Sequence, residues 1–532
     1  MKKWIYSTLI VLFSATSVCA QTIYDVVNLS NKDLNGNARF VGMGGAMGAL
    51  GANISTINTN PAGIGLYRSS DIMTSFSFST YGIESSYGAE TFKSNHNKWS
   101  YDNVGFVYSS KVGNTSTLRY VNFGFNYTRS KSFDKYMSMA GVINKTLNGK
   151  PISQTDQMAV KANQMRGDYG SAGDIKTIKS SDLFDHNLVG WLPAVGWLGH
   201  LYDFSDSDDR YVTSFPQPDS WFDSREKGGI DQYDFNVSFN FSDRFYLGFT
   251  VGAYDVNYSK RSTYGEESDL LVGENKYKEG YEMTSMNKIN GSGVDFKLGA
   301  IVRPFEDSPL RFGLGLNSPI FYNLTYRTNV RLSSNIYSFD DKELKNYIVD
   351  SYDYMNNRDY GYDFRIRTPW KYNLSMGYTV GKNVALGAEY EYQDYSTAKM
   401  SYSDGADMAY ENSTAKEMLK GVHAVRLGAE WKVVPQFALR CGYNYISEIF
   451  GSSAFKNLAP NSINTDTDYS NTKSQSNYTL GFGYQGSSFY ADLAYQYSQY
   501  SADFYPFDHP ELAKTKVTNM ANKVLLTLGM RF

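Results

Sequence analysis

Acidic and histidine side chains are the residues of this sequence whose types first suggest metal or acid–base chemistry. Asp203, Asp206, Asp208 and Asp209 lie close together, but the run lacks the regular spacing and the glycine of an EF-hand calcium loop. We interpret it as a solvated acidic loop. The histidines are scattered along the chain without metal-ligand spacing: His96, His186, His200, His423 and His509. We therefore predict no metal site, and uptake of haem through one of these histidines stays open as an alternative.

Residues for nucleophilic catalysis do not come together in any convincing Ser/His/Asp arrangement. Charged residues in the middle of strand-like segments are expected to pair with one another and to hold the structure: Glu389, Glu391, Arg426, Glu430 and Arg440. Cys441 is the one cysteine beyond the first twenty residues, so no internal disulfide is expected. We predict a protein without enzymatic activity, without catalytic residues and without a cofactor.

A glycine-rich segment near the start of the chain invites comparison with nucleotide-binding loops. Gly42 to Gly48 reads G-x-G-G-x-x-G, which is not the dinucleotide fingerprint, and no strand–helix frame surrounds it. A second motif, Asn60-Pro61-Ala62-Gly63-Ile64, is expected to form a turn. Residues 21–68 do not alternate, so we interpret them as a small, flexible segment that packs against something tight and could fold into the lumen of the molecule as a plug. Its predicted site residues are Gly42, Gly44, Gly45, Asn60, Pro61 and Ala62.

An apolar cluster lies inside a long segment, about residues 131–230. Its members sit among polar neighbours, and a large exposed apolar patch usually marks a binding surface. We predict that this cluster forms a capture loop for a hydrophobic ligand, through Trp191, Leu192, Val195, Trp197, Leu198 and Leu201. The alternative is that these side chains pack as a lid on the mouth of the molecule. Both interpretations stay open, and they are compatible with each other.

The elements that must position these residues are β-strands, because period-two alternation is the dominant pattern of the chain. From Val524 to Phe532, for example, the even-numbered residues are Val, Leu, Leu, Met and Phe, and the odd-numbered ones are Leu, Thr, Gly and Arg. A soluble sandwich alternates as well. Here, however, the second face carries Gly, Asn, Arg and Glu in mid-strand, and aromatic residues gather near the strand ends. This combination is typical of a membrane barrel with a polar lumen and two aromatic belts.

The first twenty residues predict export. Lys2 and Lys3 precede an apolar run from Trp4 to Val18, and small residues follow up to Ala20, which is the pattern of a signal peptide over residues 1–20. Lipoprotein cleavage before Cys19 is the weaker alternative, because Val18 stands where Gly or Ala is preferred. No later stretch approaches the roughly 20 apolar residues of a membrane-spanning helix. The net charge of −3 gives no reason to expect a nucleic-acid partner.

Fourteen strands are predicted, and their connections are alternately short and long. The expected strands lie near residues 70–82, 98–110, 117–130, 231–243, 244–260, 286–303, 310–328, 365–380, 383–400, 420–433, 436–448, 476–486, 488–501 and 520–532. Bacterial barrels have short periplasmic turns and long outer loops. We therefore predict an all-β fold, with a transmembrane antiparallel barrel of about 14 strands over residues 69–532 and long extracellular loops. We expect a monomer in a bacterial outer membrane, with both termini in the periplasm.

Several motifs resemble those of a known family. The run Ala38-Arg39 … Gly42-Met43-Gly44-Gly45-Ala46 … Asn60-Pro61-Ala62-Gly63-Ile64 is similar to the N-terminal hatch of the FadL/TodX family of outer-membrane hydrophobic-compound transporters. Further similar motifs follow in the same order, among them Gly293–Ala300, Arg311–Pro319 and Val425–Trp431. The resemblance covers nearly the whole chain after residue 20 and departs from the family pattern in the long outer loops.

The resemblance implies a transport mechanism. A hydrophobic compound, such as a long-chain fatty acid, would be captured by the outer loops, bind in the lumen and leave sideways into the membrane past the hatch. Its partners would be that ligand and outer-membrane lipids. This function predicts a continuous apolar pocket behind the hatch and a kink that opens the wall, expected in the third strand (117–130). The alternatives are a carrier or docking component of a secretion apparatus, which predicts a filled lumen, and a receptor for haem or another hydrophobic ligand.

Overall fold

The computed structural model describes residues 22–87, 90–114, 116–213, 215, 218–456 and 458–532. The predicted signal peptide, residues 1–20, lies outside the described residues. No helix in the described part of the chain is both long and apolar enough to cross a membrane.

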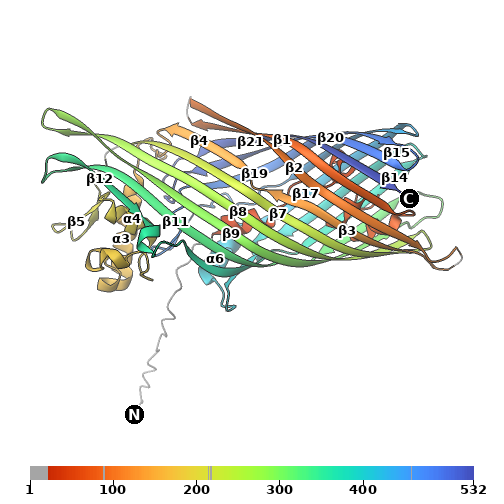
Figure 1. Cartoon of the computed structure of the whole chain (residues 1–532), viewed down its shortest axis with the longest axis horizontal. Coiled ribbons are helices and arrows are strands. Elements are labelled where there is room, and N and C mark those ends of the chain that lie inside the picture. Colours follow the sequence, from red (N-terminus) through yellow and green to blue (C-terminus); the bar gives the residue numbers. More distant parts are fainter. Residues whose placement is uncertain (1–21, 88–89, 115, 214, 216–217, 457) are drawn as a thin grey trace, which may run out of the picture.

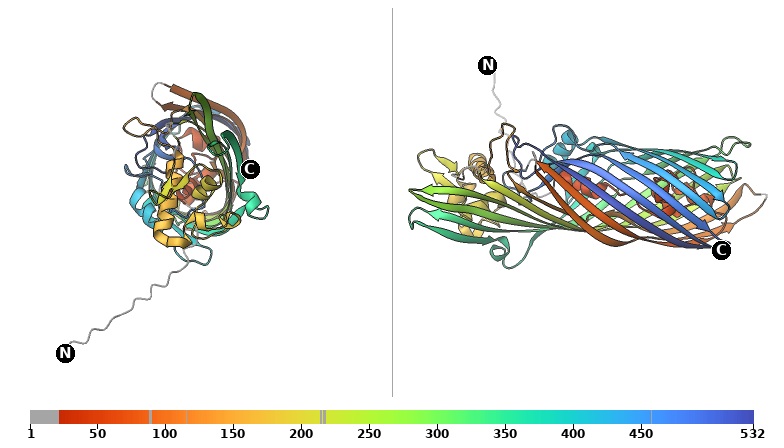
Figure 2. Two further views of the ribbon diagram at one scale, coloured as in Figure 1. Left: turned by 90° about the vertical axis from the view of Figure 1, so that its left-hand side faces the viewer. Right: turned by 90° about the horizontal axis from the view of Figure 1, so that it is seen from above.

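Antiparallel strands close into a barrel (Figures 1 and 2). The first, β1 (Asp71–Tyr87), pairs with β2 (Glu90–Lys111) on one side and with the last, β21 (Thr515–Arg531), on the other. Closure leaves the first and last strands paired, as strands in lipid require. The predicted fold class, a transmembrane antiparallel barrel of 14 strands, is confirmed.

The other strands of the barrel follow one another in chain order. They are β3 (Leu118–Ser132), β7 (Asp219–Phe241), β8 (Phe245–Val272), β9 (Asn275–Val302), β10 (Arg311–Asn317) with β11 (Phe321–Ser338), β13 (Tyr360–Arg367) with β14 (Lys371–Val380), β15 (Val384–Asp394), β17 (Gly421–Val434), β18 (Phe437–Ile446), β19 (Tyr469–Gln485) and β20 (Phe489–Tyr505). Two walls are split in the middle. Pro319 and Pro369 lie at the splits, where a proline cannot donate to the ladder. The two breaks face each other, because the Ile320 backbone N–H donates to Thr368 Oγ1 at 2.8 Å.

A band of exposed apolar side chains surrounds the barrel. Leu314, Leu374, Leu427, Leu480 and Leu526 are between 40% and 60% exposed, although they lie in mid-strand on five different walls. Leaving such side chains in water would forfeit about 1.5–3 kcal/mol each. The alternation that predicted the strands therefore points apolar residues outward to lipid and polar residues or glycines into the lumen.

Several strands extend far beyond this band. β8 and β9 pair without interruption from Phe245 and Val302 to Val272 and Asn275, over 28 residues each. About 9–11 residues are enough to cross a bilayer. Residues 261–285 were expected to be a loop, but they continue the hairpin. The reason is that polar residues occupy both faces there, so the apolar alternation disappears while the strands go on.

The segment after β3 builds the end of the molecule that lies opposite the C-terminus in Figure 1. It contains β4 (Lys135–Gly141), α3 (Gln154–Tyr169), η3 (Gly170–Ala172), η4 (Ile175–Thr177), η5 (Ser180–Asp182), α4 (Trp191–Leu198), β5 (Asp203–Ser205) and β6 (Arg210–Val212). Other outer connections carry β12 (Glu343–Asp350), α5 (Ser351–Tyr354), η6 (Tyr395–Thr397), β16 (Lys399–Tyr402) and α6 (Ala409–Met418). The end-on view of Figure 2 shows the helices over the barrel mouth.

The N-terminal segment lies inside the barrel (Figure 2). Its elements are α1 (Ile23–Ser30), α2 (Ala38–Gly42), η1 (Ile54–Asn58) and η2 (Pro61–Leu66). They pack against walls from all sides, including β3, β8 and β20. The two ends of the described chain differ in position: Phe532 pairs with Ser70 at the end with the short turns, whereas Thr22 lies inside the lumen.

Candidate functional site

The hatch, defined as residues 22–68, rests on a belt of lumen-facing wall glycines. Gly377, Gly387, Gly428 and Gly442 oppose one another directly on four neighbouring strands. A Cβ at Gly387 would come under 3.0 Å from the Ala46 carbonyl, and a Cβ at Gly428 or Gly442 would also come under 3.0 Å from a hatch atom. At Gly377 the nearest hatch atom would be 3.0 Å away. The hatch backbone therefore lies directly on the wall, which explains glycine in mid-strand.

The six predicted hatch residues all lie against the barrel wall, at this belt or on other strands. Gly44 and Gly45 have positive φ angles, of 61° and 80°, which glycine adopts readily. A Cβ on Gly42 would lie 3.3 Å from the Gly481 Cα. Asn60 donates from Nδ2 to the Ala300 carbonyl at 3.1 Å and accepts from the backbone N–H of Ala62, with Pro61 between them as the first residue of η2.

Buried ion pairs tie the hatch to the wall. Arg39 donates to both carboxylate oxygens of Glu430, each at 2.8 Å, and Arg440 donates to the same carboxylate at 2.6 Å. Glu389 accepts from the Gly48 backbone N–H at 3.0 Å and from Arg426 at 2.6 Å. These are the lumen charges that the sequence analysis expected to pair. Breaking such a pair by removing one partner costs about 3–5 kcal/mol.

A cavity of about 280 Å³ lies in the lumen beside α1, the first helix of the hatch. Its wall combines aromatic rings with charged groups: Tyr24, Phe133, Tyr258, Tyr326, Phe450 and Tyr469 alternate with Asp25, Lys131, Lys135, Glu226, Lys260 and Asp466. The expectation of a continuous apolar pocket is therefore not met, because this pocket is amphipathic. The described residues that line it include no histidine.

The wall of the barrel has a gap beside the third strand. β2 pairs with β3 from Lys111 only as far as Asn103, which faces Thr128. Beyond this point β3 shifts its register against β7, between Arg129 and Lys131. In the described part of the chain, no backbone pairing joins residues 90–102 of β2 to β3 or β4.

Hatch residues fill this gap from inside. The Asp33 backbone N–H donates to the Ser130 carbonyl at 2.9 Å, and its carboxylate accepts from the Ser132 N–H at 2.9 Å. Asn35 donates to Asp102 and to the Arg129 carbonyl, both at 2.8 Å. Side chains also bridge the gap directly, through the ion pair of Lys98 with Asp134 and the stacking of His96 on Tyr136. Asp33, Asn35, Asp102 and Arg129 also line the cavity, so the cavity borders the gap.

The predicted capture loop is packed inward. Trp191, Leu192, Val195 and Leu201 are at most 5% exposed, and only Trp197 and Leu198 are half-buried. The Trp191 indole N–H donates to the Phe184 carbonyl at 3.0 Å, and its ring packs against Phe184 and Tyr360. In this arrangement the cluster is placed as a lid over the outer mouth. A capture role, which stays a prediction, would begin at Trp197 and Leu198 or require α4 to move.

We call the segment from α3 to β6 (residues 153–212) the lid, and it is held by Glu266, on the part of β8 that projects beyond the apolar band. Its carboxylate accepts from the Gln154 backbone N–H at 2.9 Å, from Tyr264 at 2.7 Å and from the Ser153 hydroxyl, at the N-terminus of α3. Burial raises the pKa of Glu266 to about 7. Sequence reasoning missed this residue, because nothing local distinguishes it from its neighbour Glu267.

The other residues singled out in the sequence do not gather. Among the described residues, no group of three or more His, Cys, Asp or Glu side chains is placed to hold a metal ion. Asp203 begins β5, and Asp209 lies in the turn before β6, where it pairs with Arg166 at 2.7 Å. Cys441 is exposed on the outer face of β18.

Comparison with known proteins gives a match in structure alone. No protein-family model and no curated protein sequence matches this chain. A solved FadL homologue from Pseudomonas aeruginosa matches 94% of this chain and 99% of its own, at 12% identity and with a TM-score of 0.50. This chain has the FadL fold. The toluene transporters TodX from Pseudomonas putida and TbuX from Ralstonia pickettii also match 94% of it, at 11% and 12% identity, with TM-scores of 0.46 and 0.44 and with 100% and 99% of their own chains covered.

The match confirms the predicted resemblance at the level of the fold. At these identities a FadL fold does not determine a ligand. The chemical class of the ligand must therefore be inferred from the lumen of this chain, where polar and aromatic residues line one cavity.

Proposed function

We propose that this protein is an outer-membrane transporter for hydrophobic compounds that carry a polar head, such as long-chain fatty acids. The ligand enters at the outer mouth, binds in the central cavity and leaves sideways through the gap between β2 and β3. The observation that carries this proposal is that Asp33, Asn35, Asp102 and Arg129 line both the cavity and the gap.

A sideways exit suits an oily ligand. The hatch lies across the axial route on its glycine belt, so passage straight through would require the whole segment to leave. The gap begins where Tyr101 and Tyr127 stack at 5.7 Å, beside the exposed apolar band. A hydrophobic molecule that leaves there gains free energy by entering the bilayer instead of water.

The amphipathic lining favours a ligand with two different ends. The aromatic side of the cavity, where the rings of Tyr24 and Phe450 lie 5.0 Å apart, offers contact for a hydrocarbon chain. The charged groups would have to be desolvated against a pure hydrocarbon, which is costly. A polar head satisfies them instead.

The orientation follows from the connections. The short turns and Phe532 lie at one end, and the long hairpins lie at the other, so we place the C-terminal end in the periplasm. The lumen, hatch and gap are complete within one chain, so transport needs only a monomer surrounded by outer-membrane lipids.

A docking role for a secretion apparatus is the second candidate, because α3 and α4 fill the outer mouth and the β8–β9 hairpin projects far outward. Direct binding separates the two. Delipidated protein in detergent should bind dodecanoate saturably, at about one molecule per barrel, in the central cavity. Absence of saturable binding, together with absence of co-purified lipid in mass spectrometry, would leave the docking role.

A further inference from the structure

One connection crosses the lumen. The strap, defined as Leu458–Asp468, leads from β18 to β19 and is almost entirely buried, although it contains no helix or strand. It reaches β8 and β9 on the far side of the barrel. Six of the fourteen barrel strands lie between β8 and β19 in either direction around the closed sheet. A surface loop has no reason to bury its backbone in this way, since buried backbone groups need partners.

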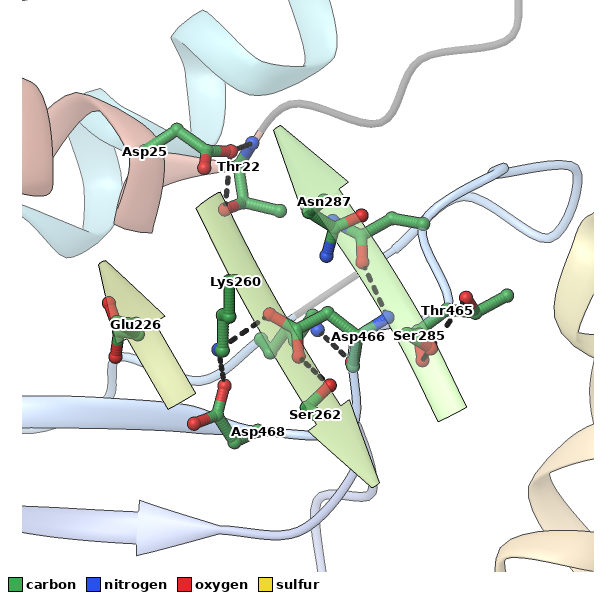
Figure 3. A network of polar contacts seen from close by, with 12 residues as sticks. Thr22, Asp25, Glu226, Lys260, Ser262, Ser285, Asn287, Thr465, Asp466 and Asp468 are labelled. Carbon is green, nitrogen blue, oxygen red and sulfur yellow. Dashed lines mark hydrogen bonds and ion pairs between the residues drawn. The ribbon is translucent and has the colours of Figure 1, made fainter. Parts of the chain in front are cut away.

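At the far wall the strap is held by Lys260 (Figure 3). Its Nζ donates to Asp466 at 2.7 Å and also pairs with Asp468, and the Ser262 hydroxyl donates to Asp466 at 2.8 Å. The Ser285 hydroxyl donates to the Thr465 carbonyl at 2.8 Å. The Lys260 side chain is 9% exposed, so this is a nearly dry ion-pair site with two carboxylates on one ammonium group.

The strap lies between the lid and the cavity. On the lid side, the Trp191 backbone N–H donates to the Ser462 carbonyl, and Lys161 donates to the Leu458 carbonyl, both at 3.0 Å. On the cavity side, Asn464, Asp466 and Asp468 are lining residues. The strap therefore lies on the way from the outer mouth to the cavity.

We infer that the strap is the outer gate of this route, and that the carboxylate of the ligand opens it by replacing Asp466 and Asp468 on Lys260. This inference rests on the proposed transport function and adds the group that selects the ligand. If the strap left without a replacement, Lys260 would be a buried and unpaired cation, which is strongly unfavourable. An anionic head restores the pairing, whereas an alcohol or an ammonium head of equal chain length does not.

A reversible lock tests the gate. Ser285→Cys with Thr465→Cys, in a Cys441→Ser background, places two thiols where hydroxyl oxygens now lie 2.8 Å apart, within disulfide reach. Oxidised protein in proteoliposomes should lose dodecanoate uptake, and reductant should restore it, whereas each single-cysteine variant transports under both conditions. Equal uptake by locked and unlocked protein would overturn the gate. No uptake by the Cys441→Ser parent would overturn the transport function itself, and the gate with it.

Binding measurements test the exchange at Lys260. The natural protein should prefer dodecanoate to dodecanol by about tenfold or more. The triple variant Lys260→Met, Asp466→Asn, Asp468→Asn removes the cation together with both carboxylates that it holds, and it should lose the preference. Lys514→Met is the matched control, because Asp503 keeps Lys473 at 3.0 Å. A triple variant that keeps the preference of the natural protein would overturn the inference.

Discussion

Single residues set how closely the hatch can approach the wall. The sequence displays the glycines of the belt and the hatch motif, but not that the two touch, because Gly428 and the Met43 carbonyl are far apart in the chain. Glycine in a strand has a conformational cost, so its repetition on one face needs a reason such as close backbone approach. The close approach is visible only in the structure, where the belt glycines and the hatch backbone lie in contact.

Gly428→Val should push the hatch away from the barrel wall. Its Cβ would fall under 3.0 Å from the Met43 carbonyl, so we expect a loss of about 1–3 kcal/mol in the free energy of unfolding and ion leakage through the lumen. Thermal unfolding in detergent and conductance in planar bilayers measure both. Ala429→Val, at the neighbouring position that faces lipid, is the control. A closed and equally stable Gly428→Val barrel would contradict the tight contact.

Glu266 makes the docking of the lid depend on pH. Burial raises its pKa from an ordinary 4.5 to about 7, so the folded state holds the proton more tightly than the unfolded state. The lid is therefore most stable below about pH 4.5, loses stability as the pH rises to about 7, and changes little above that. Protease cleavage within α3, followed against pH, measures this, and Glu266→Gln should flatten the profile between pH 4.5 and 7. The same slope in both proteins would assign the dependence to another group.

At the level of elements, lipid contact decides what a sequence can reveal. All fourteen predicted strands are present, because a wall between lipid and lumen must alternate apolar with polar residues. Where β8 and β9 leave the bilayer this requirement ends, so the pattern predicts a loop over residues 261–285 although the ladder continues. The strap shows no pattern at all, because its structure depends on Lys260, which lies 206 positions from Asp466.

The hatch segment at Asp33 and Asn35 closes the gap in the wall by hydrogen bonds that can be removed. Asp33→Ala with Asn35→Ala removes the side-chain bonds to Ser132, Asp102 and Arg129, and should cost about 1–3 kcal/mol of stability in total. The gap should then open more often, so uptake of dodecanoate should be faster and a cysteine at Ser100 should react faster with a maleimide.

Thr59→Ala is the matched control for this pair, because it changes a hatch residue that packs against β10 at Gly315, away from the gap. Slower uptake by the double variant, with unchanged reactivity at position 100, would argue that the hatch does not close the gap.

The whole molecule combines a hatch, a cavity, a strap and a lid in one barrel. Only the barrel and the existence of a hatch motif could be read from the residues, because local alternation and composition specify them. The amphipathic cavity could not, since its lining comes from α1, from walls on opposite sides and from the strap. The fold is that of a FadL homologue, but the chemistry of the lumen belongs to this chain.

On the route that we propose, the ligand leaves through the gap between β2 and β3. The most direct test is uptake of radiolabelled dodecanoate by proteoliposomes that contain Lys98→Cys with Asp134→Cys in a Cys441→Ser background, where the two side chains meet across the gap. Bridging the cysteines with a short bismaleimide should reduce uptake to the rate of protein-free vesicles while dodecanoate binding to the cavity remains. Uptake by the bridged protein at the unbridged rate would contradict the account.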